Sequence, residues 1–144
     1  MIKAIFLDWL NTLYNYKTQE LFPDAIDLLK YLKPKYKLAV MSQSDDPIPI
    51  RVKAIESLTP NFFDEIFITK GSKDALYEEA LKKFNLSPDQ VVVIDDRVIK
   101  GIQWGNKRKV TTIWMKRNDY EPPTEVTGQP THTVTELEQL KEIL

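Results

Sequence analysis

Short apolar runs alternate with amphipathic segments along almost the whole chain, and this alternation limits the folds open to it. The run Val91–Ile94 is entirely β-branched, which is typical of a strand that helices cover on both faces. Strand–helix alternation predicts an α/β fold with a doubly wound, mostly parallel sheet. The predicted strands are Ile2–Leu7, Tyr36–Met41, Ile66–Thr69, Val91–Ile94, Thr111–Met115 and Thr131–Val134. The predicted helices are Phe22–Leu32, Pro49–Leu58, Asp74–Phe84, Ile99–Lys107 and a last one that a capping-box pattern opens at Thr135–Glu138.

The size and composition of the chain exclude several classes of protein. Its 144 residues fit one domain, residues 1–144, with one core. The sequence contains no cysteine, so it has neither disulfides nor a thiolate metal site. The formal net charge of −1 and the short basic clusters argue against nucleic acid as a partner. No apolar run is long enough to cross a membrane and no secretory signal is present, so we expect a cytoplasmic protein.

Polar side chains follow four of the predicted strands, at the points where the strands end. Asp8 follows the first strand, Ser42 the second, Lys70 or Lys73 the third, and Asp95-Asp96 the fourth. The loops after parallel strands meet at one edge of the sheet, which is where ligands bind in open α/β folds. We therefore expect these side chains to form one site.

Each of these residues has a chemical interpretation and a simpler structural alternative. Asp8 is a candidate nucleophile or metal ligand, but an aspartate at a strand end also caps helices. Ser42 and a nearby lysine are candidates to hold a phosphoryl group, with a turn serine and a surface lysine as the alternatives. Asp95 and Asp96 favour Mg²⁺, although a polar turn paired with Arg97 or a nearby lysine would also relieve their repulsion.

Taken together, the motifs resemble those of the haloacid dehalogenase superfamily of aspartyl phosphotransferases, over nearly the whole chain. The first motif, D-x-D-x-T after a strand, is similar to Asp8–Thr12, and the second, Ser or Thr after a strand, is similar to Leu38–Ser42. Gly71–Tyr77 resembles the G-S-K-x-x-x-F form of capless, magnesium-dependent phosphatases, which favours Lys73 as the lysine of the site. The fourth motif, a strand followed by two aspartates, is similar to Val91–Asp96.

The resemblance implies a mechanism and a set of ligands. Asp8 would attack phosphorus and form an aspartyl phosphate, which water then hydrolyses. Mg²⁺ would be held by Asp8, by the backbone carbonyl of Leu10, and by Asp95 or Asp96. The residues that would hold the phosphoryl oxygens are Ser42 and Lys73.

Two departures from the family pattern bear on activity. Leu10 stands where the family has a second aspartate, which protonates the leaving group and later activates water. A placed general acid typically contributes about 10²–10⁴-fold, so roughly 3–5 kcal/mol of barrier lowering is missing. Lys100 or Gly101 falls where a further acidic residue often follows the fourth motif, so the metal site would carry less negative charge.

The chain has no room for the cap domain that covers the site in many relatives. Only Asn11–Leu21 separates the first motif from the first helix. An open site fits a large phosphorylated substrate, or a partner subunit that covers it, such as a second copy of the chain. The aromatic residues Trp9, Tyr14, Tyr16 and Trp104 are candidates to line that surface, with core or flap packing as the alternative.

Three functions stay open on the sequence. The first is a Mg²⁺-dependent phosphatase that works through Asp8 and is impaired by the loss of its general acid. The second is a catalytically inactive relative that keeps the fold for binding or regulation, and Leu10 motivates it. The third is a metal-free, dehalogenase-like hydrolase. It fits less well, because dehalogenases have a cap and do not usually carry paired aspartates such as Asp95-Asp96.

Overall fold

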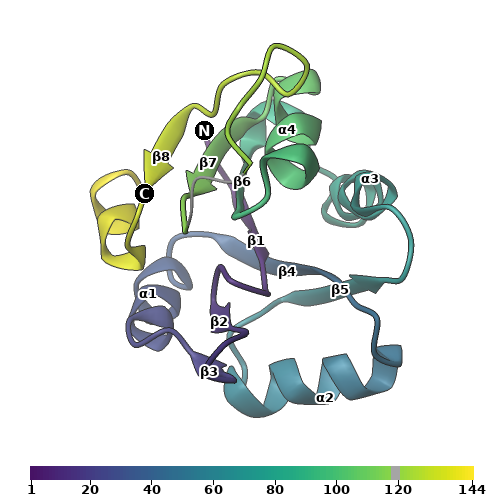
Figure 1. The fold of residues 1–144 in the computed structure, drawn as a ribbon, viewed down its shortest axis with the longest axis vertical. Coiled ribbons are helices and arrows are strands. Elements are labelled where there is room, and N and C mark those ends of the chain that lie inside the picture. The colour runs from purple at the N-terminus through teal and green to yellow at the C-terminus, as the bar shows by residue number, and fades with distance from the viewer. Residues whose placement is uncertain (118–120) are drawn as a thin grey trace.

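The computed structural model describes residues 1–117 and 121–144, and a six-stranded parallel sheet lies at its centre (Figure 1). The strands of this sheet are β1 Ala4–Asp8, β4 Lys37–Gln43, β5 Glu65–Thr69, β6 Val91–Asp95, β7 Thr111–Met115 and β8 His132–Val134. Their order across the sheet is β5-β4-β1-β6-β7-β8, and every neighbouring pair is parallel. The predicted α/β fold is confirmed.

Helices cover both faces of the sheet. The helices are α1 Ala25–Leu32, α2 Ile48–Leu58, α3 Lys73–Phe84 and α4 Gln103–Lys107, with 3₁₀ segments η1 Pro88–Gln90 and η3 Leu137–Glu142 and a π-helical turn η2 Val98–Ile102. On one face α1, α2 and η3 pack on side chains that include Leu7 and Val40. On the other face α3 and α4 pack on the alternate side chains, such as Phe6 and Val93 (Figure 1). Of the helices described, none is long and apolar enough to span a bilayer.

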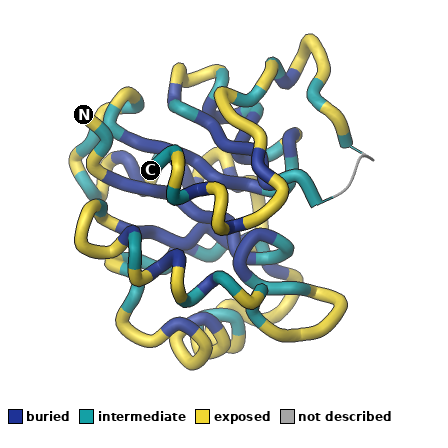
Figure 2. Tube along the Cα trace, turned by 90° about the vertical axis from the view of Figure 1, so that its left-hand side faces the viewer, coloured by how far each residue is buried: buried dark blue, intermediate teal, exposed yellow. Residues whose placement is uncertain are grey.

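The two central strands, β1 and β6, are buried along their whole length, and Figure 2 shows the buried segments running through the middle of the molecule. Their register pairs Leu7 with Ile94, so Asp8 and Asp95 come next on adjacent strands. From β1 the sheet extends through β4 and β5 on one side and through β6, β7 and β8 on the other. The strand order therefore reverses between β1 and β6, which makes this edge the expected place for a ligand.

The segment between β1 and α1 differs from the sequence expectation. The stretch 11–21, which we expected to be irregular, contains a short hairpin of β2 (Tyr14–Asn15) and β3 (Glu20–Leu21). Gln19 turns the chain with a φ of 57°, and two residues per strand are too few to produce an alternating pattern. Among the described residues this insertion holds only the hairpin, so it contains no large cap.

The two C-terminal helical segments also differ in detail. The helix predicted at Ile99–Lys107 begins one residue earlier, as the π-helical turn η2, and continues as α4. The last helix is a 3₁₀ helix, and its cap is not the predicted one. The Gln139 side chain, rather than that of Glu138, accepts the N–H groups of Thr135 and Glu136, at 2.7 Å and 3.1 Å. A glutamine side chain satisfies the first amides as well as a glutamate does.

Candidate functional site

Lys73 lies between two aspartates at the point where the strand order reverses. Its Nζ is 2.9 Å from Asp8 Oδ1 and 3.0 Å from Asp95 Oδ2. Asp8 ends β1, Asp95 ends β6 and Lys73 begins α3, so three separate elements meet here. All three residues are buried, Lys73 being only 4% exposed. Each charge therefore depends on the others, because an unpaired charge at this depth is costly.

Asp95 is held in place by several donors. Its Oδ2 accepts hydrogen bonds from the Tyr77 hydroxyl at 3.2 Å and from the Gly101 amide at 2.9 Å, in addition to the Lys73 ammonium. Its Oδ1 accepts the Arg97 amide at 3.0 Å. Burial raises the pKa of Asp95, but the Lys73 charge and these hydrogen bonds outweigh burial, so the pKa is lowered. Asp95 is therefore an ionised partner for Lys73.

The π-helical turn η2 brings the Gly101 amide onto Asp95. A Cβ at Gly101 would lie 2.6 Å from Asp95 Oδ2 and 2.6 Å from the Tyr77 hydroxyl, closer than real side chains come. Only glycine allows the backbone to approach the carboxylate this closely. π-Helical turns occur frequently at functional sites, and here the turn supplies a donor to the acidic cluster.

Thr12 and Arg117 hold the loop after β1. The Thr12 hydroxyl donates to Asp8 Oδ2 at 3.0 Å. The Arg117 guanidinium donates to the carbonyls of Asn11 and Thr12, at 2.9 Å each, and lies 3.6 Å from the centre of the Phe22 ring. Asn11 has a φ of 61°, a left-handed conformation that asparagine tolerates. Arg117 thus supports the loop that carries Leu10.

Three carboxylates gather at the ends of β1 and β6. Asp8, Asp95 and Asp96 each bring one oxygen within 4.8 Å of the other two. Burial, followed by the charges of Asp8 and Asp95, raises the pKa of Asp96 to about 10. Burial and the charge of Asp95 also raise the pKa of Asp8, against the lowering effect of Lys73. Without a cation, the cluster therefore holds a proton that it would not hold in water.

The donor set fits Mg²⁺. Three ionised carboxylates and one ammonium leave two negative charges, which a divalent cation balances, and carboxylate oxygens are ligands that Mg²⁺ prefers. Asp95 accepts four hydrogen bonds and does not line the pocket over the cluster, whereas Asp8 accepts two and lines that pocket with Asp96, so Asp8 and Asp96 are the better placed ligands. The carbonyls of Trp9 and Tyr14 accept the backbone hydrogen bonds of this loop, and these bonds leave the Leu10 carbonyl available.

A pocket of about 100 Å³ opens over the cluster. Because most of the side chains that line it are charged or polar, this pocket suits a phosphoryl group rather than an apolar organic group. Lys100 and Gln43 face each other across it, because the Lys100 ammonium donates to the Gln43 side-chain carbonyl. The lining residues are Asp8, Leu10, Asn11, Gln43, Lys73, Asp96, Arg97 and Lys100. We call this space the phosphoryl pocket.

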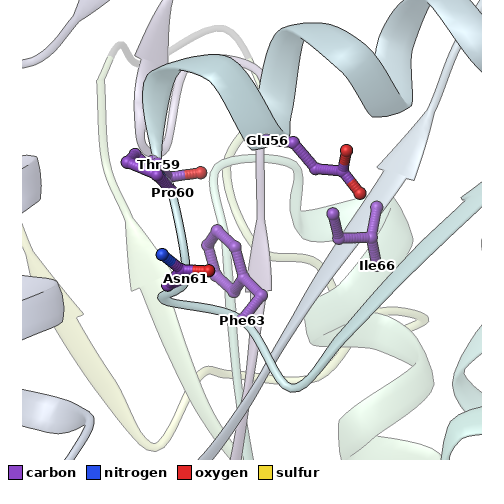
Figure 3. Close-up of a pocket in the computed structure, with 6 residues that line it drawn as sticks. All are labelled: Glu56, Thr59, Pro60, Asn61, Phe63 and Ile66. Atoms are coloured by element: carbon purple, nitrogen blue, oxygen red, sulfur yellow. The ribbon is translucent and has the colours of Figure 1, made fainter.

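A second hollow, of about 260 Å³, lies at the C-terminal end of α2 (Figure 3). Glu56, Thr59, Pro60, Asn61, Phe63 and Ile66 line it. It contains a single carboxylate and none of the residues predicted for the site. Its position also argues against it, since Ile66 lies near the start of β5 and ligands bind at the opposite ends of the strands.

Comparison with known families agrees with this geometry. The family model for haloacid dehalogenase-like hydrolases matches residues 3–107, which includes every residue of the acidic cluster. The chain belongs to this hydrolase family. The predicted family resemblance is thereby confirmed at the level of the superfamily.

Solved structures of other haloacid dehalogenase-like hydrolases share the fold. The HAD-hydrolase YfnB of Bacillus subtilis, bound to magnesium, is 13% identical with a TM-score of 0.85, covering 99% of this chain and 98% of that one. A haloacid dehalogenase-like hydrolase from Streptococcus pneumoniae is 16% identical with a TM-score of 0.78, at 99% and 98% coverage. A HAD phosphatase from Thermococcus onnurineus is 17% identical with a TM-score of 0.70, at 94% and 70% coverage. At these identities the likeness shows the fold alone.

One relative has a named activity. The glyceraldehyde 3-phosphate phosphatase of Pyrococcus furiosus is 26% identical over 140 residues, which are 93% of this chain and 58% of the relative. The chain thus spans little more than half the length of that phosphatase. Both the activity and the substrate in that name belong to the longer protein.

The structure brings most of the predicted site residues of this haloacid dehalogenase-like hydrolase together, with two exceptions. Lys70 is exposed, and its ammonium donates to the Asp45 carbonyl, so Lys73 is the lysine in the cluster. Ser42 is buried near the end of β4, where its hydroxyl accepts a 2.7 Å hydrogen bond from Arg51. Ser42 does not line the phosphoryl pocket, and its contact with phosphate stays a prediction.

Sequence reasoning missed several residues of this hydrolase site. The sequence identifies Tyr77 only as a position of a family motif, whereas in the structure its hydroxyl donates to Asp95. Arg117 and Lys100 gave no local signal, because their partners lie far away in the chain. Of the predicted aromatic residues, Trp104 stacks on Tyr77 with ring centres 4.6 Å apart, in the core on the α3 face. A glycine inside the helical pattern at Gly101 was the one available signal of a close backbone approach.

Proposed function

We propose that the protein is a Mg²⁺-dependent phosphatase that transfers a phosphoryl group to Asp8 and then to water. One observation carries the proposal: the Asp8 carboxylate ends β1 and lines the phosphoryl pocket, 2.9 Å from a buried ammonium and beside two more carboxylates. Of these neighbours, Lys73 favours the ionised form that a nucleophilic aspartate needs, and Mg²⁺ held by the carboxylates would offset the burial and the Asp95 charge, which raise the pKa of Asp8.

Each residue of the cluster has a distinct part in this chemistry. Asp8, Asp96 and the carbonyl of Leu10 would hold Mg²⁺, which supplies positive charge that shields the phosphoryl oxygens and favours the ionised form of Asp8. Lys73 holds Asp8 in position and offers its charge to the phosphoryl group. Asp95, fixed by its donors, keeps Lys73 protonated at this depth. The pKa of Lys73 is raised well above its usual value, because Asp8 and Asp95 outweigh the effect of burial.

The reaction has two displacements at phosphorus. In the first, a lone pair of the Asp8 carboxylate forms an O–P bond, and the bond from phosphorus to the ester oxygen breaks with its electron pair on the leaving oxygen. In the second, a water oxygen attacks phosphorus and the aspartyl O–P bond breaks, which regenerates the carboxylate. The proton released by the water passes to the phosphate product or to solvent.

Leu10 decides which esters react quickly. The leucine side chain at position 10 cannot protonate the leaving oxygen. A leaving group that is stable as an anion, such as a phenolate, needs little protonation, whereas an alkoxide needs a proton. Because general acid catalysis is worth about 10²–10⁴-fold, we expect aryl phosphates to react far faster than alkyl phosphates.

An aryl phosphate assay with Mg²⁺ and with EDTA tests the proposal. We expect phosphate release that requires Mg²⁺ and falls to background in Asp8→Asn. Leu10→Asp is the informative companion, since restoring a carboxylate should raise the rate on alkyl phosphates. Equal rates in Mg²⁺ and EDTA, or full activity in Asp8→Asn, would overturn the proposal.

A second candidate function rests on the same leucine. A protein that has lost its general acid can keep the fold and the metal for binding or regulation without turnover. This hypothesis predicts that Mg²⁺ binds and that no phosphate is released from any ester. The hypothesis of a metal-free dehalogenase predicts halide release at a rate that EDTA does not change. The paired aspartates beside Asp8 give no reason to prefer it.

A further inference from the structure

Another pocket, distinct from the hollow in Figure 3, lies beside the phosphoryl pocket and shares Leu10 with it. It has a volume of about 310 Å³ and lies between the β2–β3 hairpin and α2. Its apolar walls are Trp9, Leu10, Tyr14, Tyr16, Ala54 and Leu58. We call this space the hairpin pocket. Unlike the phosphoryl pocket, it is lined mainly by aromatic and aliphatic side chains.

The contact between the two pockets gives the hairpin pocket a part in substrate binding. Seven of the eight residues that line the phosphoryl pocket are polar or charged, so it suits the phosphoryl group and not an apolar organic part of the ester. Charged side chains, among them Lys73 and Asp96, form much of its wall, whereas Leu10 is its one apolar lining residue and also lines the hairpin pocket. An ester bound at Asp8 reaches the hairpin pocket by passing Leu10.

The walls of the hairpin pocket show which organic group it fits. Tyr14 stacks on Trp9, which is buried in the core, with ring centres 5.6 Å apart and 11° between their planes, so the partly exposed Tyr14 ring is held in a fixed position. Tyr16 and Leu58 are 66% and 38% exposed, so they present apolar surface that a ligand would cover. Aromatic rings bind well to such surfaces through stacking and edge contacts.

The polar side of the hairpin pocket is neutral overall. Arg51 donates to the Ser42 hydroxyl at 2.7 Å and lies 3.7 Å from the carboxylate of Asp46. With both of these partners, the guanidinium is already compensated, so the pocket does not select a second anionic group. This arrangement favours an uncharged leaving group over one with its own carboxylate or phosphate.

We infer that the hairpin pocket is a leaving-group site for aryl phosphate monoesters, with Leu10 as the contact between ring and phosphate. The inference rests on the proposed phosphatase function and specifies its substrate class. It also gives position 10 a role beyond a lost acid. The leucine that cannot protonate a leaving group packs against one that needs no proton.

Ala54→Phe tests this inference, because Ala54 is exposed on α2 and its side chain faces the hairpin pocket. A phenylalanine there fills the pocket without entering the core, and Ala54→Ser is the matched control. The measurement is calorimetric binding of two probes, 2-naphthyl phosphate and inorganic phosphate, with and without Mg²⁺. Inorganic phosphate occupies the phosphoryl pocket alone, so it reports on the fold and on that pocket.

We expect Ala54→Phe to weaken 2-naphthyl phosphate binding at least about tenfold and to change inorganic phosphate binding less than about twofold. Ala54→Ser should leave both unchanged. Equal binding of 2-naphthyl phosphate to wild type and Ala54→Phe would overturn the inference, as would an equal loss for both probes. Glyceraldehyde 3-phosphate is small and polar, so tighter binding of it than of 2-naphthyl phosphate would also overturn it.

Turnover separates this inference from the proposed function. Acetyl phosphate has a good leaving group and no ring, so its Mg²⁺-dependent hydrolysis by the wild type tests the phosphatase proposal without the hairpin pocket. If the wild type hydrolyses neither acetyl phosphate nor aryl phosphates while the binding difference persists, the phosphatase proposal fails and the aryl site stands. If hydrolysis occurs and Ala54→Phe binds 2-naphthyl phosphate as well as the wild type does, the phosphatase proposal stands and the aryl site fails.

Discussion

At the scale of single residues, the site is an arrangement of charges that need one another. Lys73 contacts two buried carboxylates, and Asp96 lies close enough to both to have its pKa raised to about 10. Asp96 is therefore the residue that we expect to hold a proton when a cation is absent. Its behaviour can be measured without any knowledge of the substrate.

The pH dependence of stability reports on Asp96. Between its unfolded pKa of 3.8 and its folded pKa of about 10, the folded metal-free protein holds a proton that the unfolded chain has lost. Stability therefore falls as pH rises, by up to about 1.4 kcal/mol per pH unit. We expect urea unfolding in EDTA between pH 6 and pH 8 to show a steeper fall for wild type than for Asp96→Asn. Identical slopes would contradict this expectation.

Lys73 should be the most sensitive single cation in the site. Lys73→Met leaves Asp8 and Asp95 buried without their counter-charge, and breaking a buried pair in this way costs about 3–5 kcal/mol of unfolding free energy. Lys70→Met is the matched control on the exposed neighbour and should cost no more than about 0.5 kcal/mol. Urea unfolding of both variants measures the difference. Similar small losses in the two would show that Lys73 is not the cation that compensates the cluster.

At the scale of elements, four segments position the acidic cluster: the ends of β1 and β6, the start of α3 and the turn η2. The strand ends could be predicted from sequence, because Ile2–Leu7 and Val91–Ile94 are continuous apolar runs followed by aspartates. The start of α3 could also be predicted, apart from the choice between Lys70 and Lys73. That choice depends on which side chain turns inward, which is a tertiary contact.

The supports of the site could not be predicted in the same way. Arg117 clamps a loop 105 residues earlier in the chain, and no local pattern encodes such a pair. The hairpin β2–β3 has strands too short to alternate, and Ser42 meets Arg51 only after α2 packs beside β4. Sequence periodicity records which face of an element is buried, but it does not record which distant donor completes a site.

Gly101 provides a direct test of the turn η2. Gly101→Ala places a methyl group within 2.6 Å of Asp95 Oδ2 and of the Tyr77 hydroxyl, so the turn must move away from the carboxylate. We expect unfolding free energy to fall by about 1–3 kcal/mol and phosphatase activity to fall with it. Gly71→Ala is the control, since its nearest neighbour, Thr69 Oγ1, would lie at an ordinary 3.7 Å. Equal stability of the two variants would contradict this account of the π-helical turn.

At the scale of the whole molecule, the fold places every candidate ligand at one edge of the sheet. The reversal of strand order between β1 and β6 opens that edge, and the short insertion after β1 leaves it without a large cap among the described residues. The proposed substrate class rests on this openness, since the hairpin, α2 and the loops that carry Leu10 and Asp46 form the walls proposed for the organic group.

Mg²⁺ binding should stabilise the whole molecule. A ligand that binds only the folded state at 100 times its Kd adds about 2.7 kcal/mol to the free energy of unfolding. We expect this gain for wild type, measured by urea unfolding with Mg²⁺ against EDTA, and a much smaller gain for Asp96→Asn. Asp45→Asn, on an exposed loop outside the cluster, should keep the full gain. A gain that is the same in all three proteins would place the cation elsewhere.

The central claim, that Asp8 accepts a phosphoryl group with Mg²⁺ beside it, is tested most directly by its fluoroberyllate adduct. Fluoroberyllate mimics a phosphoryl group on a carboxylate, and ¹⁹F NMR distinguishes the bound from the free form. We predict a bound signal in wild type that requires Mg²⁺ and is absent from Asp8→Asn. A wild-type protein that gives no bound signal with Mg²⁺, or an Asp8→Asn protein that gives the same signal, would contradict the account.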